Sequence, residues 1–122
     1  MRAATLAGAL LVAAACSASG GEKSDGNTRL VDAHTALCEA AARPDQARAL
    51  FFDRSHDALH EVARMLEDAD RAQAARLLEA KQTVESELEA SGRSQPEDVL
   101  RLADTYRTSL GRLAITVAPC NK

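Results

Sequence analysis

Apolar residues recur along most of the chain at the spacing of α-helices, and no segment alternates apolar and polar positions as a strand does. β-Branched residues are also sparse. The pattern predicts four helices, over about residues 28–42, 45–68 and 70–90 and from Ser94 to just before Pro119. Because the connections between them are short, we expect an all-α fold, a small antiparallel helical bundle.

Turn and capping residues mark where these helices begin and end. Pro44 ends the first helix, since the residue before a proline is pushed out of the α region. We expect the second helix to break near residues 53–55, where Asp and Ser can cap a restart, and Gly92 suits the end of the third. The fourth begins at residues 94–97, which match a capping box with proline in the first turn.

The fourth helix has the most regular apolar stripe, with steps that alternate between four and three residues. We expect the members of this stripe to face the core: Val99, Ala103, Tyr106, Leu110, Leu113 and Val117. Pro119 then ends the helix just before Cys120.

The first residues have the composition of a secretory signal peptide. A positive charge at Arg2 precedes an apolar run over residues 3–12 and then small residues up to Cys16. The run is too short to span a bilayer, which takes about 20 apolar residues. Residues 12–16, Val-Ala-Ala-Ala-Cys, resemble the lipobox of bacterial lipoproteins, although Ala13 stands where the usual pattern prefers leucine.

This resemblance covers only the first 16 residues, and it implies a location rather than an activity. It implies that Cys16 carries acyl chains such as palmitate and becomes the first mature residue; the alternative is an ordinary secretory signal. The chain then divides into a signal peptide at 1–15, the lipidated cysteine with a Gly/Ser-rich flexible tether at 16–27, and a helical domain at 28–122. We expect an exported protein, anchored by lipid to the outer face of a bacterial cell membrane.

Charge indicates which partners the chain can bind, and the cysteine content indicates a disulfide or a metal site. The chain has 15 basic and 18 acidic residues and no basic stripe, which argues against nucleic acid. With Cys16 assigned to lipid, Cys38 and Cys120 remain as a pair in an oxidising compartment, so we predict a disulfide between them. It would stabilise the domain by about 4 kcal/mol in the chain-entropy model. Cys120 must fold back to reach Cys38, and a thiolate metal site is the alternative.

The candidate site for a metal ion lies in the second helix. His56 and His60 are four residues apart, so both imidazoles share one helix face and can reach a single ion. Asp53 and Asp57 offer oxygen atoms nearby, and His34, on the inner face of the first helix, is a candidate third ligand. The alternative is that these histidines pack at the edge of the core and bond to a carboxylate.

No motif for catalysis is present in the sequence. It has no Gly-rich phosphate loop and no recognisable nucleophile motif, and the acidic residues of the third helix suit a solvated face. We therefore expect a lipid-anchored binding or interaction module, not an enzyme and without a cofactor, whose partners are the membrane and another envelope protein. The alternative function is a lipoprotein that handles a transition metal ion, zinc, copper or iron, through His56 and His60.

Overall fold

The computed structural model describes the backbone of residues 14–121 and the side chains of residues 26–121. All regular structure in this part of the chain is helical, and the predicted all-α fold is confirmed. The main helices are α1 (Ala14–Ala42), α3 (His56–Ala69), α4 (Arg71–Ser91) and α5 (Pro96–Arg112). Three short helical segments join α1 to α3: a 3₁₀ turn at Pro44–Gln46, α2 (Ala47–Leu50) and a π-helical turn at Phe51–Ser55.

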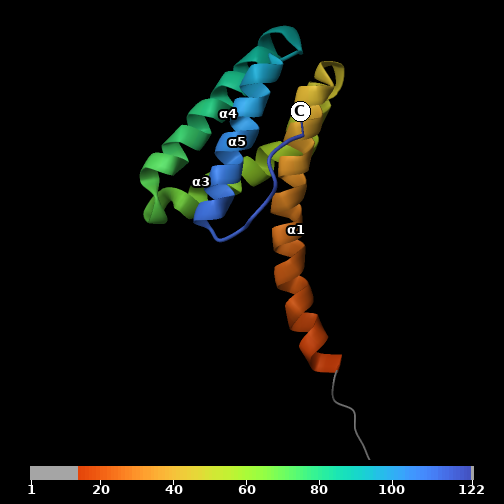
Figure 1. The fold of residues 1–122 in the computed structure, drawn as a ribbon, viewed down its shortest axis with the longest axis vertical. Helices are drawn as coiled ribbons and strands as arrows, with labels where there is room; N and C mark the ends of the chain where they lie inside the picture. Colours follow the sequence, from red (N-terminus) through yellow and green to blue (C-terminus); the bar gives the residue numbers. More distant parts are fainter. Residues whose placement is uncertain (1–13, 122) are drawn as a thin grey trace, which may run out of the picture.

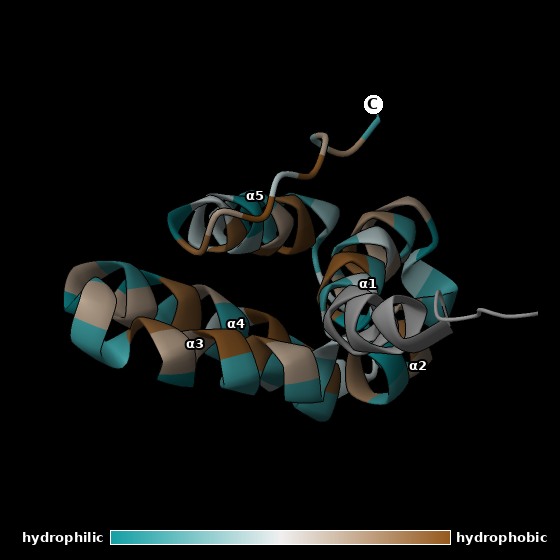
Figure 2. Cartoon of the chain, turned by 90° about the horizontal axis from the view of Figure 1, so that it is seen from below, coloured by the Kyte–Doolittle hydropathy of each residue, from teal (hydrophilic) through white to brown (hydrophobic). Residues whose placement is uncertain are grey.

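The helices form a small bundle in which α4 runs opposite to α3 and to α5, α5 runs opposite to α1, and α3 lies obliquely across α1 (Figure 1). Helix α5 packs between α1 and α4, and α3 packs along α4. The apolar surfaces of α4 and α5 face each other in the view along the bundle (Figure 2). After α5, the C-terminal tail turns back and runs along α1 (Figure 1).

The core is made mostly of leucine, valine and alanine, with Phe51 and Tyr106 as its largest side chains. Four members of the predicted stripe on α5 are buried: Val99, Ala103, Tyr106 and Leu110. Leu113 and Val117 are half-buried and pack against the core from the tail rather than from a helix. The stripe therefore identifies the inward-facing residues correctly, although the helix is shorter than predicted.

The end of α5 corrects the prediction of a helix that continues to Pro119. The N–H of Ile115 bonds to the carbonyl of Leu110 at 2.9 Å, and the N–H of Ala114 bonds to that of Gly111 at 3.0 Å. These two bonds form a Schellman motif, which ends a helix with one residue in the left-handed conformation. Ala114 occupies that position, with a φ of 64°. Glycine is the usual residue there, so its absence hid the helix end from sequence analysis.

The start of α5 also differs from the predicted capping box. Gln95 is the N-cap and makes no capping bond with its side chain, whereas Pro96 occupies the first turn as predicted. Glu87 of α4 accepts hydrogen bonds from the Ser94 hydroxyl and from the Gln95 N–H, the latter at 3.0 Å. The carboxylate that satisfies this turn therefore comes from the preceding helix, because α4 and α5 form a close hairpin.

The predicted break near residues 53–55 is a π-helical turn, in which the chain continues to coil. Ser55 does not cap α3, contrary to expectation. Its hydroxyl donates to the carbonyl of Ala33 on α1 at 3.3 Å instead. The serine at this break thus joins two helices.

Helix α1 begins well before the predicted start near Thr28. The segment 16–27, predicted to be a flexible tether, continues the helix, and this part of α1 projects beyond the bundle (Figure 1). The segment has no proline, and each residue added to an existing helix contributes one further hydrogen bond. The first described core residue of α1 is Leu30. The division of the chain at residues 15 and 27 stays a prediction, and residues 1–13 of the predicted signal peptide lie outside the described part of the chain.

Candidate functional site

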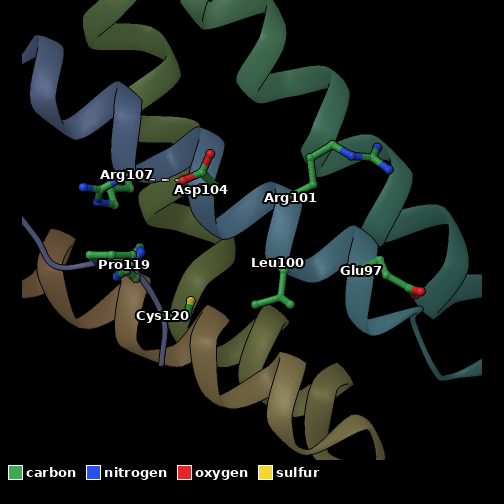
Figure 3. Close-up of a pocket in the computed structure, with 8 residues that line it drawn as sticks. Glu97, Leu100, Arg101, Asp104, Arg107, Pro119 and Cys120 are labelled. Carbon is green, nitrogen blue, oxygen red and sulfur yellow. Dashed lines mark ion pairs between the residues drawn. The ribbon is translucent and has the colours of Figure 1, made fainter. Parts of the chain in front are cut away.

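A pocket of about 320 Å³ opens between α1, α5 and the C-terminal tail (Figure 3). Helix α5 provides one wall with four charged side chains and Leu100, and the tail provides Pro119 and Cys120. His34 of α1 also lines the pocket. Sequence analysis did not find this pocket, because residues 113–118, which carry Pro119 and Cys120 back along α1, were expected to be helical.

The predicted disulfide is present and fixes the tail against α1. Cys38 and Cys120 are bonded, with their Cα atoms 5.3 Å apart and 82 positions apart in sequence. The tail folds back as the pairing requires (Figure 1). Arg107 of α5 holds the same segment, since its Nε donates to the carbonyl of Val117 at 3.0 Å. Both cysteines are half-buried, so the disulfide lies at the edge of the core and is partly accessible to solvent.

His34 lies beside the disulfide. Its side chain is only 5% exposed, and its Nδ1 and Nε2 are 3.9 and 4.0 Å from the Cys38 sulfur. The imidazole is stacked with the Tyr106 ring, with centroids 6.4 Å apart. Burial lowers the pKa of His34, the Arg107 guanidinium lowers it further, and Asp104 partly opposes them. His34 is therefore neutral at pH 7.

Charges of alternating sign follow one another along the pocket wall of α5. Glu97, Arg101, Asp104 and Arg107 are three or four positions apart, so they share a helix face. Arg107 Nη1 lies 3.7 Å from Asp104 Oδ1, a contact drawn in Figure 3. Arg101 Nη2 donates to Asp98, on the neighbouring edge of the helix, at 2.7 Å. The wall therefore offers both hydrogen-bond donors and acceptors beside the apolar side chain of Leu100.

The predicted metal ligands do not all come together. His56 and His60 are adjacent on α3, with ring centroids 4.7 Å apart. His34 lies elsewhere, beside the disulfide, which corrects its assignment as the third ligand of this pair. Asp57 is exposed and lies 3.5 Å from His56 Nδ1, and Asp53 is exposed on the π-helical turn.

Glu85 of α4, one of the acidic residues expected on a solvated face, is instead half-buried and contacts His56. Glu85 Oε2 lies 3.0 Å from His56 Nε2, and its other oxygen accepts from the Lys81 ammonium at 2.9 Å. Lys81 is only 5% exposed, so this cation already balances the carboxylate. Burial lowers the pKa of His60, and Lys81 and His56 lower it further. The contact with Glu85 matches the alternative of a packed histidine bonded to a carboxylate for His56, whereas His60 is exposed. Metal binding by His56 and His60 stays a prediction.

Within residues 26–121, one group of three side chains brings its potential ligand atoms within 4.8 Å of one another: His34, Cys38 and Cys120. The four-residue spacing of His34 and Cys38, one helical turn apart, could have indicated that these two side chains lie together. Sequence analysis missed it because His34 was considered as a ligand of the His56–His60 site and Cys38 as half of a disulfide. In the disulfide form the sulfurs are bonded to each other, so neither is free as a thiolate ligand or nucleophile.

Comparisons with known proteins leave the function to be argued from this geometry. No protein-family model, curated protein sequence or solved structure matches the chain. Among the described residues, none of the helices has the length and apolar character needed to cross a bilayer.

Proposed function

We propose that this chain is a lipid-anchored binding module of the bacterial cell envelope, which acts outside the membrane and catalyses no reaction. The observation that carries this proposal is the charged wall of α5 beside a pocket whose opposite side is a tail fixed by a disulfide. A surface held in this way is ordered before it meets a partner, which lowers the entropy lost on binding.

The charge pattern of the wall favours a protein partner. Two carboxylates and two guanidinium groups give the wall no net attraction for a uniformly charged surface, but they match a surface with the reverse alternation. Nucleic acid and an anionic lipid surface both present only negative charge. Another envelope protein, with its own alternating charges, is the partner that fits the α5 wall.

The anchor and the binding surface are well separated along α1. From Cys16 to Leu30, where contact with the described core begins, a helix rises by about 21 Å. Lipid attached to Cys16 would therefore hold the bundle clear of the headgroups. This spacing would leave the α5 wall accessible to a partner in the same membrane.

A site-directed crosslinking experiment in bacterial cells tests the proposal. A photo-crosslinking amino acid replaces Arg101 on the α5 wall and, in a matched control, Arg64 on the exposed side of α3. We expect a discrete crosslinked product from position 101 but not from 64. Adding Cys16→Ala should move the protein from the membrane to the soluble fraction and abolish the product.

Two results would contradict the proposal. If positions 101 and 64 crosslink alike, the α5 wall is not a specific binding surface. If the wild-type chain is found in the soluble fraction, the lipobox assignment at Cys16 is wrong.

A further inference from the structure

We propose that His34, Cys38 and Cys120 form a zinc site when a dithiol reduces the disulfide between the two cysteines. The site would thus be closed in the oxidised protein and open in the reduced one. This site is distinct from the predicted His56–His60 pair. It lies beside the pocket proposed above to bind a protein, and it would bind a different ligand, a divalent d¹⁰ cation.

The three residues already have nearly the separation that zinc requires. Zn–S bonds of about 2.3 Å and Zn–N bonds of about 2.0–2.1 Å place sulfur and nitrogen ligands about 3.6 Å apart in a tetrahedral site. The His34 nitrogens are 3.9 and 4.0 Å from the Cys38 sulfur. All three ligand atoms lie within 4.8 Å of one another, so a small rotation of the imidazole would direct one nitrogen toward the ion.

Reduction would separate the two sulfurs without releasing the tail. The dithiol supplies two electrons and two protons, the S–S bond breaks to give two thiols, and the dithiol becomes a disulfide. Zinc then displaces a proton from each thiol. The sulfurs must move apart only to about 3.8 Å, the distance between two sulfur ligands in a tetrahedral zinc site. Arg107 still holds Val117, and Ile115 and Val117 still pack against the core.

The site is accessible, and its charges balance. Pockets of about 320 Å³ lie on both sides of the tail, and both include His34 and Cys120 in their walls. A reductant and an ion can therefore reach the sulfurs without opening the bundle. Two thiolates neutralise Zn²⁺, so the Arg107 guanidinium nearby does not oppose the loaded site, and water from the pocket can complete a fourth position.

The test is a metal titration of the full chain carrying Cys16→Ser, so that Cys16 contributes no thiol. The protein is reduced with a phosphine, and the reductant is then removed under anaerobic conditions. Co²⁺, a coloured substitute for zinc, is titrated into the reduced protein. We expect the reduced protein to bind one equivalent of Co²⁺ with a sulfur-to-cobalt charge-transfer band, and Zn²⁺ to displace it. The oxidised protein should show no such band.

Variants assign the ligands. Adding Cys120→Ser should abolish the charge-transfer spectrum or reduce it to that of one thiolate. Adding His34→Gln should weaken affinity at least about tenfold, the smallest loss seen when even an outer partner of a metal ligand is removed. His60→Gln, at an exposed position on α3, serves as the matched control and should bind like the parent.

Circular dichroism keeps the result interpretable if reduction loosens the bundle. In that case Zn²⁺ should restore the helical signal and raise the melting temperature of the reduced protein, but not of its Cys120→Ser variant. The proposal is overturned if the reduced parent binds no Co²⁺, or if the His34→Gln variant binds as tightly as the parent. Binding that is equal in oxidised and reduced protein and lost in the His60→Gln variant also overturns it, because such binding belongs to the His56–His60 pair.

Discussion

The hydroxyl of Tyr106 provides the most direct test of how α5 is held against α1. The ring is fully buried, and its hydroxyl donates to the carbonyl of Leu30 at 2.7 Å. Tyr106→Phe removes this bond and leaves the ring in place. A carbonyl inside a helix also accepts the N–H four residues later, so the substitution does not leave the Leu30 oxygen without a donor.

We therefore expect Tyr106→Phe to cost about 1 kcal/mol at pH 7, the net value of one hydrogen bond. For a domain of this size, that loss lowers the melting temperature by roughly 4–8 °C. Thermal and urea unfolding followed by circular dichroism give both quantities.

The pH dependence of this difference has a definite sign. Burial raises the pKa of Tyr106 well above its usual range; Arg29 acts to lower it and Glu61 to raise it. The folded protein thus keeps its phenol proton at a pH where the unfolded chain loses it. This contribution to stability is complete below about pH 10 and decreases above it, by at most about 1.4 kcal/mol per pH unit. Because the Tyr106→Phe variant has no phenol proton to lose, its stability does not decrease in this way. The difference in stability between wild type and variant should therefore shrink and then reverse as the pH rises above about 10.

Absorbance of the phenolate gives an independent readout, because Tyr106 is the one tyrosine of the chain and tryptophan is absent. In the native protein, phenolate absorbance should increase only together with the loss of helical signal. If it increases near pH 10 while the helical signal is unchanged, Tyr106 is accessible and the packing of α5 on α1 is wrong. The same conclusion follows if the two proteins have equal stability at pH 7 and the same dependence on pH.

Two further substitutions test the polar cluster on α4 and the end of α5. Glu85→Gln leaves the buried Lys81 ammonium without its carboxylate and should destabilise the fold by about 3 kcal/mol. This value is the lower end of the range for a broken buried ion pair, because Glu85 is partly exposed. Equal urea midpoints for the variant and the wild type would contradict this prediction. Ala114→Gly relieves the strain of the left-handed conformation in the Schellman motif and should stabilise the protein by about 1 kcal/mol, as measured by thermal unfolding. A loss of stability would show that this turn is not as described.

The sequence predicted the helices well wherever periodicity and terminal residues agreed. Helix α4 begins after Asp70, whose side chain accepts from the Gln73 N–H, and ends at Gly92 in the left-handed conformation. Both are common capping residues, so the predicted bounds of 70–90 were nearly correct. At the end of α5 the same left-handed position holds Ala114, which gives no such signal.

Contacts between helices were harder to predict than the helices themselves. Glu87 satisfies the turn before α5 from another helix, and Ser55 bonds to α1 instead of capping α3. In both cases a local motif suggested a local partner, whereas the bundle supplied a distant one. Similarly, the spacing of His56 and His60 correctly placed the two rings together, but the contact with Glu85 required knowledge of how α3 packs on α4.

The disulfide and the predicted length of the last helix were incompatible, and simple geometry shows why. Tyr106 contacts α1 at Leu30, and Cys38 lies about 12 Å further along α1 at 1.5 Å per residue. Because α5 runs in the opposite direction, a helix continued to Val117 would end about 16 Å beyond the Tyr106 level on the other side. Residues 118–120 could then recover only about 10 Å of a gap of about 28 Å, which is too little for a disulfide with Cα atoms within about 7 Å.

Ending the helix at Arg112 removes this conflict. Arg112 lies only about 9 Å beyond the Tyr106 level, which leaves about 21 Å to the level of Cys38. Residues 113–120, fully extended, span up to about 26 Å, enough to reach it. A disulfide between Cys38 and Cys120 therefore requires the helix to stop several residues before Val117. The same reversal carries Pro119 and Cys120 over His34, so the turn at Ala114 determines both the disulfide and the pocket beside it.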